Sequence, residues 1–210
     1  MEENFMKPDK VMKKLFDDLK NDLGKQYLLS LLNDKDQEPI NGKTRLMKEL
    51  FFISLNVPSL DKIFEFEADN YGPSSDVVIG YLDEMSQMKL ITAKHRSQDN
   101  YTIYSIGEYG KKFLEEENLS LDNDLISEIK ELCSGITNDE LLALTYFSFP
   151  EMTEESLVKD KIWAKRKNLA LGLYKKNKVS LEKAVEISGL NHPQFLDFLN
   201  SKNIKVELLI

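Results

Sequence analysis

Residues 42–117 constrain the fold most, because their pattern changes type several times within one short stretch. Phe64-Glu-Phe-Glu-Ala-Asp69 alternates apolar and acidic residues, which indicates a strand, and Gly72-Pro73 then separates it from a helical pattern. The expected elements are a helix from Gly42 or Lys43 to Asn56, a strand over 64–69, a helix over 75–88, strands over 90–94 and 101–105, and a helix from a capping box, Ser105 to Glu108, to Glu117. This order predicts a winged helix.

Helical patterns flank this stretch on both sides. The expected helices cover 8–23, stopped by Gly24; 25–33; 125–133; 140–149, capped by Thr137-Asn-Asp-Glu140; a segment capped by Thr153; 165–178; 181–188; and 192–202. Residues 115–124 are acidic and turn-prone, which is typical of a linker. We therefore expect a mainly α protein with a small β-hairpin wing, divided into a winged-helix domain with N-terminal helices (1–118) and a helical domain (119–210).

The charge distribution is strongly asymmetric. The chain has a net charge of −8, but residues 158–210 carry 11 Lys and Arg against five Asp and Glu, a net charge of +6. An acidic body with a basic end is a composition that meets nucleic acid on one face only. The alternative is that the acidic and basic parts attract one another.

The C-terminal end has the pattern of a helix-turn-helix. Ser180 is expected to cap the helix over 181–188, and Gly189-Leu-Asn191 forms a tight turn into the helix that starts at His192. Val185, four residues before Gly189, is the expected packing residue between the two helices. A helix-turn-helix places its second helix in the major groove.

Candidate DNA contacts fall into three groups. The second helix offers polar residues for base edges, since Gln and Asn pair bidentately with adenine, and the preceding basic helix and the hairpin tip offer cations for phosphates. By contrast, the helix over 75–88 exposes acidic residues and is a poor match for DNA. The candidates are Lys94, His95 and Arg96 at the tip; Lys165, Arg166, Lys167, Lys175, Lys176 and Lys178 on the basic helix; and His192, Gln194, Asn200 and Lys202 on the last helix.

Catalytic, metal and cofactor sites are not expected. The sequence has no glycine-rich phosphate loop, no Gly-x-Ser-x-Gly and no His-Glu-x-x-His, and it contains one cysteine and two histidines. Cys133 follows apolar residues at helical spacing, which predicts a packed thiol. The carboxylates of the 64–69 stretch predict a solvated strand face, because same-face neighbours lie roughly 7 Å apart. Tyr146, Phe147 and Phe149 are expected to pack in the core or at an interface.

Two resemblances follow from these motifs. Gly42-Lys-Thr-Arg-Leu-Met-Lys48, the stretch Phe64 to Ser75 and Leu90-Ile91 resemble the YwgA-like winged-helix proteins and, more distantly, the Panacea (SocA-like) antitoxin domains, over residues 25–117. The stretch Ala170 to Asn191, with Phe195-Leu-Asp-Phe-Leu199, is similar to a family of small prokaryotic helical proteins described as candidate antitoxins, often encoded beside PIN-domain ribonuclease toxins. That family usually has alanine where this chain has Val185.

The sequence therefore leaves two functions open. The first is a cytoplasmic regulator that binds double-stranded DNA as a homodimer, since such motifs usually pair half-sites, and that serves as the antitoxin of a toxin-antitoxin pair. The second is a protein-binding module that neutralises a partner protein, such as a toxin, without binding DNA. No stretch is apolar enough for a membrane span, and the start lacks the basic residues of a signal peptide, so no membrane contact is expected.

Overall fold

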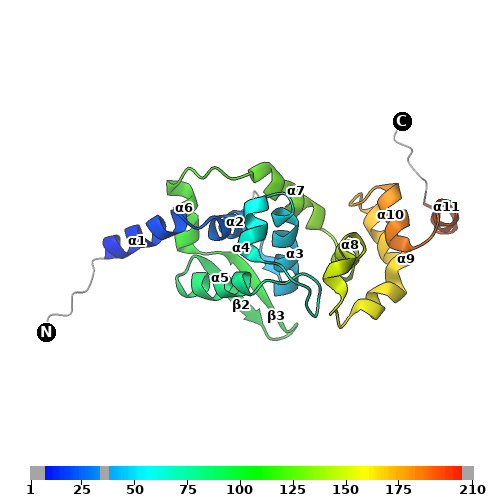
Figure 1. Cartoon of the computed structure of the whole chain (residues 1–210), viewed down its shortest axis with the longest axis horizontal. Coiled ribbons are helices and arrows are strands. Elements are labelled where there is room, and N and C mark those ends of the chain that lie inside the picture. Colours follow the sequence, from blue (N-terminus) through cyan, green and yellow to red (C-terminus); the bar gives the residue numbers. More distant parts are fainter. Residues whose placement is uncertain (1–7, 34–37, 205–210) are drawn as a thin grey trace. The chain divides into compact units, whose positions relative to one another are not determined.

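The protein is mainly helical with a small antiparallel sheet (Figure 1), as predicted. The computed structural model describes residues 8–33 and 38–204. Contacts divide the chain into two compact units. Unit 1 contains the chain up to Glu65 together with Ser75–Glu131, and unit 2 contains Phe66–Ser74 together with the chain from Leu132 onward.

Unit 1 is built on buried apolar helix faces. Its core includes Leu28, Leu50, Phe64, Val78 and Phe113, each of which has an exposed fraction of zero. Burying such side chains stabilises the fold by roughly 1.5–3 kcal/mol each. The helices are α1 (Pro8–Lys20), α2 (Leu23–Leu32), α3 (Lys43–Ser54), α4 (Pro58–Phe64), α5 (Asp76–Gln87), α6 (Glu108–Glu116) and α7 (Asn123–Cys133), whose last two residues belong to unit 2.

The sheet of unit 1 has the order β1-β3-β2, with strands β1 (Ile40–Asn41), β2 (Ile91–Arg96) and β3 (Tyr101–Ile106). The hairpin β2–β3, here called the wing, pairs Ile91 with Ile106 and Arg96 with Tyr101. Ser105 lies in β3, where its hydroxyl bonds that of Thr92 at 2.6 Å. The capping box predicted at Ser105 is therefore wrong, and Gly107 is the N-cap of α6.

The strand predicted over 64–69 is also wrong. Pro58 begins a helix that continues through Phe64, and Glu65 ends it in the left-handed conformation, with φ 48°. Residues 66–74 then form a loop that a bridge between Glu67 and Ser74 closes, with a second bridge, between Asn70 and Gly72, inside it. Phe66 is buried while Glu65 and Glu67 are exposed. The alternation of apolar and acidic residues therefore predicts which side chains are buried, but these residues do not pair as a strand.

Gly24 does not stop the first helix. It lies inside α2, where an added Cβ would be 2.8 Å from the Tyr81 ring. The first helix ends instead before Asp22, whose carboxylate caps α2 by accepting the Lys25 N–H at 3.0 Å. Close packing therefore explains this glycine.

α7 belongs largely to unit 1. The Asp122 N–H donates to the Tyr27 hydroxyl at 3.4 Å, and Lys130 Nζ donates to the Glu38 carbonyl at 3.3 Å. The division between units thus falls at Glu131 rather than after residue 118, and residues 66–74 lie with unit 2. Residues 117–122, within the expected linker, form no helix or strand.

Unit 2 begins with the capping box predicted at Thr137 and Glu140. The Thr137 hydroxyl accepts the Glu140 N–H at 3.2 Å, and the Glu140 carboxylate accepts the Thr137 N–H at 2.6 Å. Thr153 caps no helix, because it ends a 3-10 turn. The elements are α8 (Asn138–Ser148), η1 (Pro150–Thr153), α9 (Lys159–Lys175), α10 (Leu181–Ser188) and α11 (His192–Ser201).

Candidate nucleic-acid interface

The helix pair α10–α11 forms where the sequence predicts it. The Ser180 hydroxyl caps α10 by accepting the Lys183 N–H at 3.2 Å, and Gly189 ends α10 in the left-handed conformation, with φ 70°. Asn191 then caps α11 through a second capping box, since Asn191 Oδ1 accepts the Gln194 N–H at 2.9 Å and Gln194 Oε1 accepts the Asn191 N–H at 3.0 Å. Local hydrogen bonds therefore fix both the turn and the start of the second helix.

The packing between these helices differs from the expectation in one residue. Ala184, Ile187, Phe195 and Leu199 are fully buried, whereas Val185 is only half-buried. The buried residue of α10 at this point is therefore Ala184, one position before the predicted Val185. The Tyr174 and Phe195 rings meet edge to face at 6.4 Å and join α11 to α9.

α11 turns polar side chains to solvent. His192, Gln194, Asn200 and Lys202 are all exposed, and so is Asp197. The Lys202 ammonium lies 5.7 Å from the centre of the Phe198 ring. These candidates therefore share one helix and its C-cap, and they are accessible to a ligand.

Two lysines of the basic segment are held by acidic residues of α8. Lys165 and Lys161 both bond the Asp139 carboxylate, at 2.9 and 3.2 Å, and the Lys165 hydrogen bond is the main cause of the lowered pKa of Asp139. Lys176 pairs with Glu140 at 2.7 Å. Burial raises the pKa of Glu140, but the hydrogen bonds from Lys176 and Thr137 outweigh it and leave that pKa lowered. Lys176 is thus neutralised within unit 2, and Lys165 shares the single negative charge of Asp139 with Lys161.

Arg166 has a structural position. Its guanidinium donates to the carbonyls of Ile187 at 2.7 Å and Glu186 at 3.0 Å, which lie in the last turn of α10. It also stacks 4.2 Å from the centre of the Phe147 ring. A Cβ at Gly189 would lie 2.6 Å from the Arg166 Cζ atom, so glycine both adopts this φ without strain and leaves room for the guanidinium. Arg166 therefore acts as a C-terminal cap for α10.

The remaining cations of this segment differ in exposure. Lys167 and Lys175 are exposed, and Lys178 is half-buried. Positive charge available near α10–α11 is thus smaller than the sequence count suggests.

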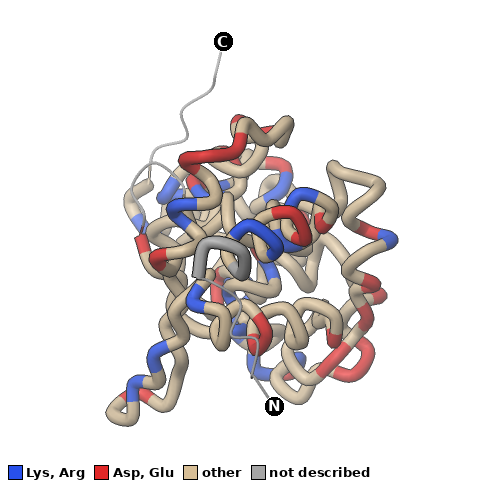
Figure 2. The backbone as a smooth tube through the Cα atoms, turned by 90° about the vertical axis from the view of Figure 1, so that its left-hand side faces the viewer, with Lys and Arg blue, Asp and Glu red and all other residues tan. Residues whose placement is uncertain are grey.

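The wing of unit 1 exposes Lys94, His95 and Arg96 on β2 (Figure 2, the hairpin at the lower left). The register places Lys94 and Arg96 on one face, because side chains alternate along a strand, and His95 on the other. Arg96 donates to the Tyr101 hydroxyl at 3.3 Å and forms an ion pair with Asp99 at 3.8 Å. The three predicted residues therefore lie together at the tip, but they do not share a single face.

α5 lacks the charge needed to approach a phosphate backbone. Its sequence contains no Lys or Arg, and Asp76 and Asp83 are exposed. Glu84 forms an ion pair with Lys25 at 2.8 Å, which neutralises a nearby positive charge. The wing is accordingly the basic part of this region.

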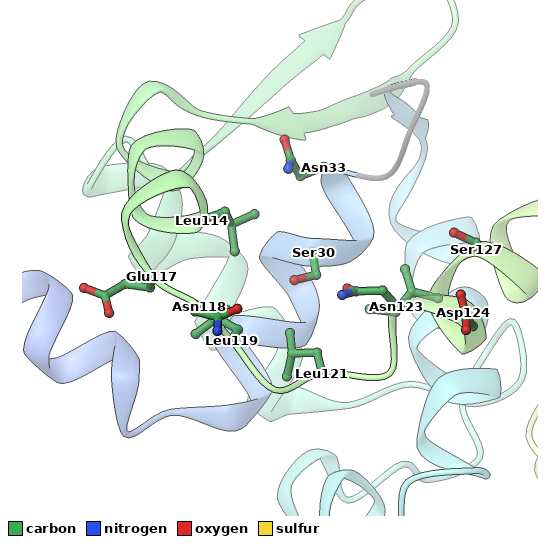
Figure 3. Close-up of a pocket in the computed structure, with 11 residues that line it drawn as sticks. Ser30, Asn33, Leu114, Glu117, Asn118, Leu119, Leu121, Asn123, Asp124 and Ser127 are labelled. Atoms are coloured by element: carbon green, nitrogen blue, oxygen red, sulfur yellow. The ribbon is translucent and has the colours of Figure 1, made fainter.

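A pocket of about 420 Å³ lies in unit 1 between α2, α6 and α7 (Figure 3). The Asn123 side chain points toward Ser30, Leu114 and Leu121 point inward, and Glu117 points away, pairing with Lys20 at 2.8 Å. None of the described lining residues is basic, so the pocket offers no counter-charge to a phosphate. Over residues 8–33 and 38–204, no group of three or more His, Cys, Asp or Glu side chains is arranged to hold a metal.

Two features were not found from the sequence. One is the Asn191–Gln194 capping box, which the spacing Asn-x-x-Gln would have signalled. The other is the exposure of Leu157 (76%) and Tyr71 (47%), for which no local sequence signal exists. The part of the chain that the structure describes contains no helix long and apolar enough to cross a membrane.

Comparison with known proteins gives one family match. A search of curated proteins finds no significant match to this chain. Residues 145–209, less than half of the chain, match the model of an uncharacterised protein family (UPF0175). The match contains the whole of α9, α10 and α11 and thus the helix-turn-helix pair.

Proposed function

We propose that this protein is a transcriptional regulator that binds double-stranded DNA through the α10–α11 pair. The observation that carries the proposal is the capped start of α11, with His192 and Gln194 exposed on its first turn. In helix-turn-helix proteins the N-terminal residues of the second helix contact base edges. Asn200 lies further along the same helix, where it is also exposed.

Phosphate contacts are assigned to cations that the fold leaves available. Lys175 ends α9, and Lys202 follows α11; both are exposed and flank the helix pair in sequence. Lys167 is a third. Such contacts release counterions, so binding must weaken as salt increases.

The first test is binding of the whole chain to a fluorescein-labelled random-sequence duplex, followed by anisotropy from low to high salt. We expect the logarithm of the association constant to fall linearly with the logarithm of salt concentration, with a slope of about −0.9 for each neutralised phosphate. Absence of binding at the lowest salt would refute the proposal.

A pair of double variants locates the contact. Lys175→Glu with Lys202→Glu should weaken binding and make the salt slope shallower. The matched control is Lys13→Glu with Lys62→Glu, which makes the same charge change at exposed positions of α1 and α4 in unit 1. Equal loss of affinity in both would indicate general charge attraction and would contradict recognition by α10–α11.

Binding as a homodimer belongs to the same proposal, because two helix pairs would read two half-sites. Sedimentation of the chain with a selected duplex measures this directly. Two protein chains per duplex are expected, whereas a single chain on a single half-site would contradict it.

A second candidate function is protein binding, as expected of an antitoxin. The observation that favours it lies in unit 2, where the Leu157 N–H donates to the Asn70 carbonyl at 3.0 Å and so places two exposed apolar residues, Tyr71 and Leu157, on adjacent segments. We call this surface the acidic corner, because its two segments, 66–74 and 149–157, contain no Lys or Arg and expose five carboxylates: Glu67, Asp69, Glu151, Glu154 and Glu155.

An apolar pair with an acidic border fits a basic protein partner with an apolar anchor. Its probe is a labelled amphipathic peptide of lysine and leucine, measured at physiological salt. Glu154→Lys with Glu155→Lys should weaken binding, and Glu115→Lys with Glu116→Lys on α6 is the control with the same charge change. Equal affinity of the two double variants would reject the acidic corner.

The antitoxin role combines these two activities in one chain. The resemblance of the C-terminal stretch, Ala170 to Asn191, to a family of candidate antitoxins supports it.

A further inference from the structure

We infer that Gln194 acts on DNA as a hydrogen-bond donor and so selects guanine rather than adenine; this specificity rests on the proposed function. Gln194 is the third residue of α11, and its Oε1 accepts the Asn191 backbone N–H at 3.0 Å. A backbone N–H can only meet the oxygen of an amide, so the capping box fixes which end of the side chain is which. The amide nitrogen is the end left for a ligand.

This fixed orientation changes the base that Gln194 complements. A glutamine pairs with adenine by accepting from N6 while donating to N7, so it needs both ends of its amide. Here the oxygen is bound to the start of α11, and the side chain presents two N–H donors. The major-groove edge of guanine offers two acceptors, N7 and O6, and no donor.

The other exposed polar residues at the start of α11 differ from Gln194 in position or in orientation. Asn191 Oδ1 is engaged in the same way, since it accepts the Gln194 N–H at 2.9 Å, but Asn191 is the N-cap and precedes the first turn of α11. His192 and Asn200 are exposed, but no hydrogen bond in the described structure fixes the direction of either side chain. Gln194 is therefore the exposed side chain of α11 whose donor direction is set before DNA arrives.

The substitution Gln194→Glu separates the two roles of this side chain. Glutamate serves as well as glutamine at this position of a capping box, so the start of α11 is preserved. The outward donor becomes an acceptor, and a carboxylate accepts from the N4 amino group of cytosine. The variant should therefore exchange guanine for cytosine at one position of the site.

The experiment selects bound duplexes from a random library with the full-length protein, the Gln194→Glu variant and an Asn200→Asp control. We expect guanine at one position of each half-site, preferred about tenfold over adenine. Gln194→Glu should enrich cytosine there, while Asn200→Asp, with the same added charge on α11, should bind more weakly and retain guanine. Circular dichroism melting confirms that both variants fold.

The possible outcomes distinguish the base preference of Gln194 from DNA binding itself. If the wild type and Gln194→Glu enrich the same base at every position, the inference about Gln194 is overturned while DNA binding stands. Adenine at the position that Gln194→Glu alters would also overturn it. If the wild type binds no duplex at low salt, the proposed function fails and the inference fails with it.

Discussion

Replacing Arg166 by methionine tests whether this residue is a structural cap or a phosphate contact. Methionine keeps much of the side-chain volume but removes the two hydrogen bonds to the carbonyls of Ile187 and Glu186. A hydrogen bond from a charged donor contributes roughly 1.5–3 kcal/mol, and stacking on an aromatic ring adds about 0.5–1 kcal/mol. Because Arg166 is partly exposed and water can replace its bonds, we expect a loss of about 3 kcal/mol in the free energy of unfolding of unit 2.

Trp163 provides the measurement. It is the single tryptophan of the chain and its ring lies 4.4 Å from that of Phe147, beside Arg166, so its fluorescence reports on the packing of unit 2. With a urea dependence of about 2 kcal/mol per molar, Arg166→Met should lower the unfolding midpoint by about 1.5 M. Arg166→Lys should recover less than half of the loss, since an ammonium lacks the planar fork of donors.

Lys167→Met is the control, because Lys167 is the exposed neighbouring cation of α9. Its midpoint should stay within about 0.3 M of the wild type. If Arg166→Met unfolds at the wild-type urea concentration and yet binds DNA more weakly, the capping role assigned to Arg166 is refuted.

Three further predictions concern stability. Burial raises the pKa of Glu49 to about 7, so between about pH 4.5 and 7 the folded state keeps a proton that the unfolded state, with a pKa of 4.5, releases. The free energy of unfolding should therefore fall as the pH rises through this range. Glu49→Gln should remove this fall, as measured by urea titrations followed by circular dichroism. Gly110→Ala should destabilise unit 1, because the new Cβ would lie 2.2 Å from the Leu90 carbonyl oxygen. Gly80→Ala on α5 meets open space instead, so it should stabilise the helix by about 1 kcal/mol and raise the melting temperature. Thr137→Ala should cost about 1 kcal/mol in urea unfolding read by Trp163, and Thr137→Ser should retain most of it; equal midpoints would contradict the capping role.

The sequence predicted best those elements whose signals are local. α10 has its expected bounds, and the Thr137 capping box and both strands of the wing are present. In each case a side chain bonds a backbone group three residues away, or two short strands are joined by a tight connection. Such interactions depend on neighbours in sequence and are readable without the fold.

The sequence did not show which of the predicted phosphate contacts already have intramolecular partners that are distant in sequence. Lys165, Arg166 and Lys176 form a basic segment, but Asp139, the end of α10 and Glu140 satisfy them from 20 to 36 residues away. A count of charges along the chain cannot contain these partners. The strand predicted over 64–69 was wrong because alternating burial occurs both in strands and in loops that pack on a core.

The loop 66–74 has a consequence for how the chain is made. The polypeptide leaves unit 1 after Glu65 and returns at Ser75, so a piece of unit 2 leaves the ribosome long before the rest of it. The Asn70 carbonyl then lacks its two donors, the Ser156 hydroxyl and the Leu157 N–H, until those residues have been synthesised. A fragment that starts at Leu132 would lack this acceptor permanently, and unit 2 can be completed only after translation has passed through the whole of unit 1.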